Sequence, residues 1–406
     1  MRYYFWINMN TEEQQPKSRR EQVRAIGQSG NYWYAMEMSS KLKKGKSVEV
    51  IFWKSPIALY RGEDGKVFAI ENRCPHRQLR LTSGIVQGNE ITCQYHGWTF
   101  NGCGKCTGIS HELGKGKAKD SLPNIKVNSY PVQEKYGLIW VFPGDPALAD
   151  KVHIPEVPQL TQENPWEFVP LDFTLKAHFS MILENVCDFN HAFLHRKFKP
   201  FTDPHLLGTR HEGDIIYVDY ETDMSQSSAV KTAGEKKGEG LEDMTLWYHY
   251  PYQGSNTADK YLHWLFMTPI DEKTTRCFFV FLLGPLEIPF INKPVPKFLR
   301  KTVIRLANFF YIVPLLKEDV FILQEEMLGQ ERHPHIQHLE FNPIVGGFQK
   351  LSIKKWNEYI HTEALRKQKQ LDSKERYIFP GAGLTKKELQ EYNRMLEESK
   401  ELEMQS

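Results

Sequence analysis

Two short cysteine–histidine pairs constrain this chain more than any other feature of its sequence. Cys74 and His76 form the first pair, and Cys93 and His96 follow after sixteen intervening residues. Zinc fingers usually group cysteine with cysteine and histidine with histidine, and this pattern does not. Two thiolates and two imidazoles from two loops are the ligand set of a Rieske [2Fe–2S] centre, in which the cysteines bind one iron and the histidines the other. The pattern therefore predicts a cluster that accepts single electrons.

A second group of metal-binding residue types follows later in the chain. The apolar spacing around Asp188, His191 and His195 predicts a helix, and on a helix these three side chains would lie within roughly 60° of one another. Two imidazoles plus one carboxylate, with positions left open, form the facial triad of non-heme Fe(II) oxygenases. Asp319 is the best candidate for the carboxylate, because it follows an apolar stretch and opens a second helical pattern. Its neighbour Glu318 is an alternative that helical phase does not exclude.

Both groups together resemble the terminal oxygenase (alpha) component of the Rieske non-heme iron oxygenases, in the aromatic-ring-hydroxylating dioxygenase family. The resemblance covers roughly residues 30–330 and extends beyond the two metal motifs. It rests on the cluster loops Asn72–Arg77 and Cys93–Trp98, the strand Tyr136–Val141, the Asn185-x-x-Asp188-x-x-His191 helix, the strand end Thr268–Asp271 and the pair Glu318-Asp319.

The resemblance implies a role for each matching residue. Cys74, His76, Cys93 and His96 would hold the cluster, and His191, His195 and Asp319 would bind the mononuclear Fe(II). Asp188 would bridge an iron-ligand histidine to a cluster-ligand histidine across a subunit boundary, which implies a homotrimer. Asn185 would lie near the iron without binding it.

Two positions depart from the family pattern. The family usually places four residues between its two iron histidines, whereas Ala192, Phe193 and Leu194 give three here. The usual proline after the second cluster cysteine is Gln94, a minor change in a loop.

The function implied by the resemblance is that of a terminal oxygenase, either a monooxygenase or a dioxygenase. It would use O₂ and relayed electrons to hydroxylate or oxidatively demethylate a small organic substrate, lipophilic or aromatic. A ferredoxin or a flavin-dependent reductase would reload the cluster. Arg73, Arg77 and Arg80 make one cluster loop basic, which suits an acidic partner, although these arginines could equally pack within the loop. The competing functions are a Rieske electron carrier without a working second iron site, and a regulatory ligand-binding protein.

Composition narrows the class of protein. The 406 residues suffice for two domains. Lysine and arginine total 52 against 50 acidic residues, and this near-balance argues against a nucleic-acid partner. Six cysteines fit a reducing compartment. The apolar run at the N-terminus is too short for a signal peptide, and no uncharged stretch is long enough to span a membrane. We therefore expect a cytoplasmic location, with or without membrane association.

The expected fold class is α+β. Short strand-like runs separated by Gly, Asn and Asp turns predict an all-β Rieske domain over residues 29–145, after an N-terminal arm over 1–28. A helix-grip catalytic domain, with an antiparallel sheet and helices, is expected over 159–365. The tail over 366–406 contains a capping box at Thr385–Glu388 and predicts an amphipathic helix.

Three other segments have open interpretations. Residues 225–243 are polar and predict a flexible loop. Cys103 and Cys106 could form a redox-active thiol pair. The interpretation we favour is that both cysteines lie in a hairpin turn and have no redox role. Residues 285–316 are basic, aromatic and amphipathic, so they could lie on a membrane surface and suit a lipophilic substrate such as a carotenoid, sterol or tetrapyrrole. The alternative, which we favour here, is a helix that covers the substrate pocket or packs between subunits.

Overall fold

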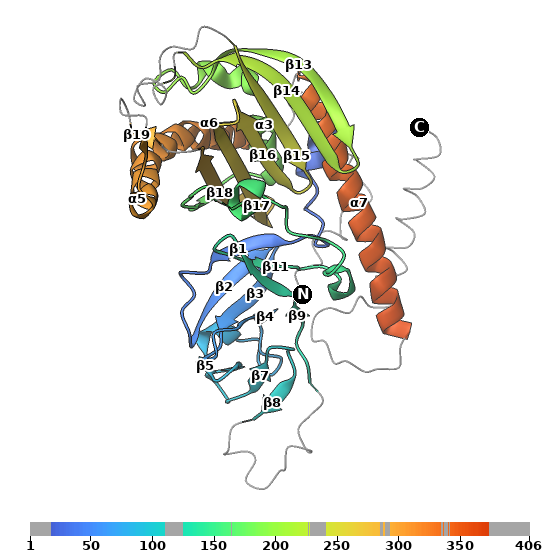
Figure 1. Cartoon of the computed structure of the whole chain (residues 1–406). Coiled ribbons are helices and arrows are strands. Elements are labelled where there is room, and N and C mark those ends of the chain that lie inside the picture. The colour runs from blue at the N-terminus through green and yellow to red at the C-terminus, as the bar shows by residue number, and fades with distance from the viewer. Residues whose placement is uncertain are drawn as a thin grey trace. The chain divides into compact units, whose positions relative to one another are not determined.

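A computed structural model of the chain describes residues 18–109, 125–163, 165–225, 227, 241–284, 287–288, 293–333, 336, 340 and 342–372. The described residues form two compact units, one of residues 28–154 and 355–372, the other of residues 18–27 and 155–354 (Figure 1). The predicted capping box at 385–388, the tail helix and most of the 225–243 loop lie outside the described residues.

Small antiparallel sheets build the first unit. Their orders are β1-β11-β10, β2-β3-β4-β9 and β5-β6-β7-β8. The strands are β1 (Tyr34–Met38), β2 (Lys46–Phe52), β3 (Ser55–Arg61), β4 (Val67–Glu71), β5 (Ile85–Gln87), β6 (Glu90–Thr92), β7 (Thr99–Asn101), β8 (Cys106–Gly108), β9 (Ser129–Tyr130), β10 (Val132–Lys135) and β11 (Leu138–Val141). The 3₁₀ turns Leu81–Ser83 and Pro146–Leu148 also belong to this unit.

Turn residues and apolar residues explain this unit. Gly65 takes a φ of 98° in the turn between β3 and β4, a conformation that favours glycine. The apolar faces of the β3–β4 and β6–β7 hairpins meet in one core that includes Tyr60, Ile91 and Phe100. Cys74 and Cys93 are members of the same core. The cysteine ends of both candidate cluster loops are therefore fixed by packing.

A seven-stranded antiparallel sheet dominates the second unit, in the order β12-β18-β17-β16-β15-β14-β13. The strands are β12 (Leu171–Leu175), β13 (Thr202–Glu212), β14 (Ile215–Asp223), β15 (Glu242–His249), β16 (Tyr252–Thr257), β17 (Tyr261–Asp271) and β18 (Thr274–Leu283). A small ribbon pairs β19 (Glu287–Ile288) with β20 (Lys293–Pro294). Buried and half-buried residues alternate strictly along β14, as expected for a sheet with one covered face.

In the described residues the helices are α1 (Arg19–Arg24), α2 (Pro158–Thr161), α3 (Phe179–Cys187), the 3₁₀ turn Phe189–Phe193, α5 (Lys297–Ala307), the π-helical turn Asn308–Ile312, α6 (Val313–Arg332) and α7 (Pro343–Asp372). α3 packs against β17 and α6 (Figure 1). The predicted α+β class, with an all-β domain before a sheet-and-helix domain, is confirmed.

Two predicted helices differ from the structure. The helix expected to carry Asp188, His191 and His195 ends at Cys187, because Asp188 is extended with φ −106° and ψ 99°. A short 3₁₀ turn follows, and His195 lies beyond it. The helix expected to open near Asp319 begins far earlier, since α5, the π-helical turn and α6 follow one another with helical backbone at each junction.

Candidate metal centres

The two candidate cluster loops have the same backbone geometry. The Cys74 N–H donates to the Leu79 carbonyl at 2.7 Å, and the Cys93 N–H donates to the Trp98 carbonyl at 2.8 Å. Four residues after each cysteine, the N–H returns to the cysteine carbonyl, and this residue has a φ of 64° in both loops, at Gln78 and at Gly97. The two loops therefore form equivalent turns, although the histidine follows the cysteine by two residues in one loop and by three in the other.

The side chains of the first site fit a Rieske cluster. Cys74 and Cys93 are buried and carry free thiols. Burial raises the pKa of the Cys74 thiol to about 11, and the adjacent Cys93 adds to the effect. The imidazoles of His76 and His96 lie with ring centroids 4.6 Å apart. The Nδ1 atom of His96 is buried and has no hydrogen-bond partner in the described part of the chain, which is the condition expected of a nitrogen that awaits a metal.

Surrounding side chains fix the outer half of this site. The His76 ring stacks on Trp98 at 5.2 Å between centroids. Arg73 pairs with Glu71 at 2.5 Å, whereas Arg80 remains 65% exposed and lies 3.5 Å from Glu49. Part of the basic character of this loop is therefore neutralised internally, and Arg80 still faces solvent.

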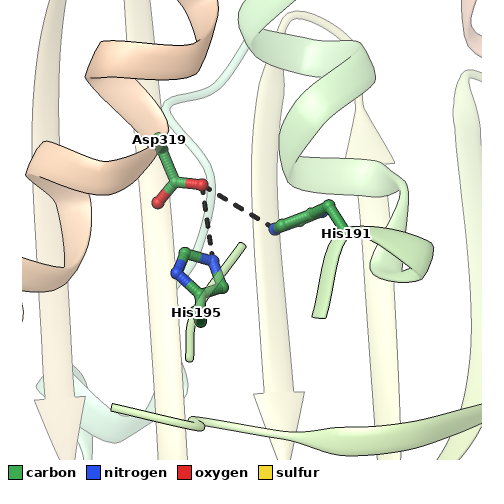
Figure 2. A group of neighbouring side chains, drawn as sticks. All are labelled: His191, His195 and Asp319. Carbon is green, nitrogen blue, oxygen red and sulfur yellow. Dashed lines mark ion pairs between the residues drawn. The ribbon is translucent and has the colours of Figure 1, made fainter. Parts of the chain in front are cut away.

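The second site brings together His191, His195 and Asp319 from different segments (Figure 2). The Nε2 atoms of His191 and His195 lie 3.7 and 3.5 Å from the same Asp319 Oδ1. One ligand atom from each residue lies within 4.8 Å of the others. Asp319 Oδ1 is buried and has no hydrogen-bond partner among the described residues. Two imidazoles converging on an unsatisfied carboxylate oxygen fit a mononuclear metal ion.

The opposite nitrogen of each imidazole is held by an oxygen. His191 Nδ1 donates to the backbone carbonyl of Asp188, and His195 Nδ1 donates to Glu318 Oε2 at 2.9 Å. Because both partners are acceptors, Nδ1 carries the proton and the Nε2 lone pair faces Asp319. This is the usual outer hydrogen bonding of metal-ligating histidines. Glu318 thus lies on the far side of the His195 ring, and Asp319 is the carboxylate at the convergence point.

Desolvation governs the titration of these side chains. Burial raises the pKa of the Asp319 carboxyl, while His195 and His191 and a hydrogen bond from Asn185 oppose the increase. Burial likewise lowers the pKa of His191. Neutral imidazoles are the form that binds metal. Asn185 therefore contacts the Asp319 carboxylate.

Asn342 holds the Asp188 side chain and was not identified from the sequence. Its Nδ2 donates to Asp188 Oδ1 at 2.9 Å, and its Oδ1 accepts the Ile344 N–H at 3.0 Å at the start of α7. The Asn-Pro dipeptide at 342–343 is typical of a helix start, and this signal could have located the residue. Its contact with Asp188 depends on tertiary structure.

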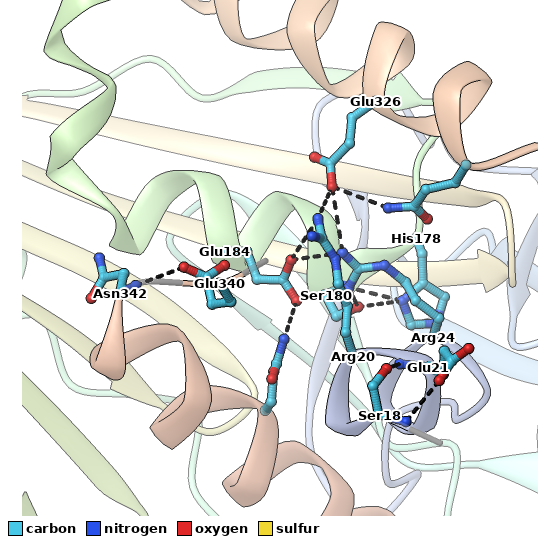
Figure 3. A network of polar contacts seen from close by, with 12 residues as sticks. Ser18, Arg20, Glu21, Arg24, His178, Ser180, Glu184, Glu326, Glu340 and Asn342 are labelled. Carbon is cyan, nitrogen blue, oxygen red and sulfur yellow. Dashed lines mark hydrogen bonds and ion pairs between the residues drawn. The ribbon is translucent and has the colours of Figure 1, made fainter. Parts of the chain in front are cut away.

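A buried ionic network connects the helices that carry the second site (Figure 3). Arg24 of α1 forms two hydrogen bonds to Glu184 of α3, at 2.9 and 2.6 Å, and Gln349 of α7 donates to the same carboxylate at 2.8 Å. Arg20 pairs with Glu326 of α6. Burial acts to raise the pKa of Glu184, but Arg24 outweighs it and the pKa lies below its ordinary value. The sequence offered no motif for this network.

His178 completes the network as a neutral side chain. Its Nδ1 accepts the Ser180 N–H at 3.2 Å, where it caps α3, and its Nε2 donates to the Ile26 carbonyl at 2.9 Å. Burial, with Arg24 nearby, lowers the pKa of His178 to about 3.

Two family models match parts of this chain. The family model of the Rieske [2Fe-2S] domain matches residues 32–131, and that of the vanillate O-demethylase oxygenase C-terminal domain matches residues 175–293. The 4beta-methylsterol monooxygenase of Methylococcus capsulatus is 51% identical over 341 residues, which cover 84% of this chain and 92% of that protein. The oxygenase component of dicamba O-demethylase from Stenotrophomonas maltophilia is 35% identical over 167 residues, covering 41% of this chain and 47% of that protein.

Solved structures show the same fold. The crystal structure of dicamba monooxygenase bound to 3,6-dichlorosalicylic acid superposes with a TM-score of 0.61 at 21% identity, covering 86% of this chain and 98% of that one. Another structure of this enzyme is described with non-heme iron and dicamba. With a Rieske domain, an oxygenase domain and a monooxygenase relative aligned over most of its length, the chain belongs to the Rieske non-heme iron oxygenases.

Proposed function

We propose that this chain is the terminal oxygenase of a monooxygenase system acting on a 4β-methylsterol or a closely similar polycyclic lipid. The observation that carries the proposal is the 51% identity to 4beta-methylsterol monooxygenase over 92% of that protein. Hydroxylation would place one atom of O₂ on the substrate and the other in water, with two electrons and two protons consumed. The electrons would come from a ferredoxin or a flavin-dependent reductase.

The side chains near the second site suit an apolar substrate. The Phe201 ring lies 5.7 Å from the His191 ring and 5.9 Å from the His195 ring. Phe198 packs edge-on against Tyr311 at 5.4 Å, and Phe198 and Phe201 are both buried. Apolar walls at this position would exclude water and receive hydrocarbon.

We assign the residue roles as follows. His191, His195 and Asp319 would hold the mononuclear iron, which when bound supplies the activation of O₂. Cys74, Cys93, His76 and His96 would hold the cluster, which when bound supplies single electrons. These assignments rest on the convergence of Nε2 atoms on Asp319 Oδ1 and on the buried thiols.

The chain's own residues orient these ligands. The Asp188 carbonyl and the Glu318 carboxylate keep the Nδ1 protons of the two imidazoles in place. We propose that the Asp188 carboxylate, held by Asn342, connects the two metal sites across the subunit boundary of a homotrimer. We propose that this assembly is located in the cytoplasm.

The test is turnover of a defined sterol. The purified chain, a ferredoxin-type reductase, NADH and isotope-labelled O₂ are incubated with a 4β-methylsterol, and mass spectrometry follows the label. We expect label in a hydroxylated sterol, with iron analysis giving two irons for the cluster and one for the mononuclear site. His191→Ala is the matched control and should give no labelled product. Unlabelled sterol from a fully iron-loaded enzyme would refute the proposed substrate.

A further inference from the structure

The helix α5 and the π-helical turn after it expose an unusual number of large apolar side chains. Phe298 is 81% exposed, Phe309 69% and Phe310 68%. Leu299 and Leu306 are also exposed. We call these five residues the α5 face. Single exposed apolar residues are common on protein surfaces, but a contiguous group marks an interaction site.

Burial divides this segment into two sides. One side carries the exposed α5 face. The other side carries Ile304, Asn308 and Ile312, which are buried. Asn308 Nδ2 donates to the Val169 carbonyl at 3.0 Å. The buried side therefore anchors the segment to its own unit, and the α5 face is left toward solvent.

The charged side chains of the segment that carries the α5 face have one sign. Residues 297–317 contain no acidic side chain, and their basic side chains are Lys297, Arg300, Lys301, Arg305 and Lys317. The whole chain carries a net charge of only +2, so this is a local excess. Lys301 reaches Glu167 at 3.7 Å but remains 60% exposed.

The alternation of cationic side chains and phenylalanines indicates which kind of partner the α5 face would bind. A second copy of the same face would bring like charges together, and an apolar protein surface would leave the cations without counter-charges. An anionic bilayer satisfies both, because the rings enter the acyl boundary and the cations meet lipid headgroups. We infer that the α5 face docks this protein on the surface of anionic membranes. In the described ranges, no helix is long and apolar enough to cross a membrane, so the contact is peripheral.

The α5 face and Asp319 of the second metal site lie on the same continuous helical segment. Phe310 precedes Asp319 by nine residues, which corresponds to about 14 Å along a helix axis. A lipid substrate in the surface of the bilayer would therefore lie close to Asp319, one of the residues proposed to bind iron. This role in substrate delivery rests on the proposed function, whereas the docking itself does not.

Flotation with vesicles tests the docking. The full chain is mixed with vesicles of phosphatidylcholine alone, or of phosphatidylcholine with phosphatidylglycerol, and centrifuged through a density gradient. We expect flotation with the anionic vesicles and much less with the neutral ones. The Phe309→Ser, Phe310→Ser double variant should lose at least roughly a hundredfold in partitioning if both rings insert fully. Lys301→Glu and Arg305→Glu should each lower partitioning onto anionic vesicles at least about fivefold. Added salt should also lower this partitioning.

A matched control comes from the same unit. Leu206 and Leu207 are adjacent exposed apolar residues on β13, at 47% and 58%, and their double substitution by serine should leave flotation unchanged. Equal flotation of wild type and the Phe309→Ser, Phe310→Ser variant would overturn the inference, as would wild type that stays at the bottom of the gradient. A change of oligomeric state in that variant would also overturn it, since the face would then be a subunit contact.

Turnover assays separate this inference from the proposed function. With sterol dispersed in detergent, the Phe309→Ser, Phe310→Ser variant should turn over like wild type, and with sterol in anionic vesicles it should be slower. Flotation without turnover of any sterol would refute the proposed substrate and support the docking. Turnover with unaltered flotation of the double variant would refute the docking and support the substrate.

Discussion

Replacing Asn342 should separate the stability of α7 from the orientation of Asp188. Asn342 is only 9% exposed. Its Oδ1 caps α7 through the Ile344 N–H, and its Nδ2 donates to Asp188 Oδ1. Serine is as good an N-cap as asparagine, but its shorter side chain does not extend to Asp188. Asn342→Ser therefore removes only the contact with Asp188, whereas Asn342→Ala removes both contacts.

The two contacts differ in magnitude. A hydrogen bond to an ionised acceptor contributes about 1.5–3 kcal/mol, and an N-cap contributes about 1 kcal/mol. We expect Asn342→Ser to lower the free energy of unfolding by about 2 kcal/mol and Asn342→Ala by about 3 kcal/mol. If the lost 1.5–3 kcal/mol is what orients Asp188 for electron transfer, the transfer rate falls roughly ten- to a hundredfold in both variants.

The assay is a single turnover. The cluster is reduced with dithionite, the protein is mixed with O₂ and substrate, and visible absorption follows reoxidation of the cluster. Urea denaturation gives the stability of each variant, and iron analysis verifies that both centres are loaded. We expect equal slowing in the two variants despite their unequal stability. Reoxidation of Asn342→Ser at the wild-type rate, or slowing in proportion to lost stability, would refute the positioning role.

Three further outcomes follow from the same contacts. Asp188→Asn should retain all of the iron and nearly abolish turnover, and unchanged turnover would remove Asp188 from the electron path. His191→Ala should lose the mononuclear iron while the Rieske absorption survives, because the two sites lie in different units; loss of both would indicate misfolding. The folded-state pKa of His178 is about 3 against 6.5 unfolded, so acid favours the unfolded chain, and the His178 contribution to stability falls as pH drops below 6.5. Between pH 7 and 5 this loss is about 2 kcal/mol, so in urea denaturation the fall in stability over this range should be about 2 kcal/mol smaller in His178→Asn than in wild type.

The sequence located the local features of the fold correctly. The short strand-like runs expected between Gly, Asn and Asp turns occur in the first unit, with β3 and β4 among them, because alternating apolar residues between turn signals are sufficient to define them. The hairpin turn favoured for Cys103 is present between β7 and β8, with Cys103 exposed and Cys106 buried. The strands β13 and β16 of the second unit could not be located from the sequence. The exposed polar residues of β13 and the polar residues of β16 give no clear alternation, so only their pairing in the sheet defines them.

Residues that act through tertiary contacts were beyond sequence reasoning. Glu184 looks like any helical glutamate, and only the fold reveals that Arg24 and Gln349 converge on it. The segment at 285–316 shows a partial success. Its periodicity indicated an amphipathic helix, and α5 has one buried side. Its other side is apolar as well as basic, in keeping with the composition noted from the sequence, but which phenylalanines are exposed is known only from the fold.

The short spacing between His191 and His195 becomes intelligible from the backbone around them. On one continuous helix the two imidazoles would project in parallel from the same face. The extended conformation at Asp188 instead starts a 3₁₀ turn, so His191 and His195 leave the chain from different backbone geometries. Two consecutive acidic residues then complete the arrangement from α6. Successive helical residues project about 100° apart, which lets Glu318 hold His195 Nδ1 while Asp319 faces both Nε2 atoms. The pair therefore divides two tasks between neighbours, since one carboxylate fixes the tautomer of His195 and the other is left unsatisfied where a metal would bind.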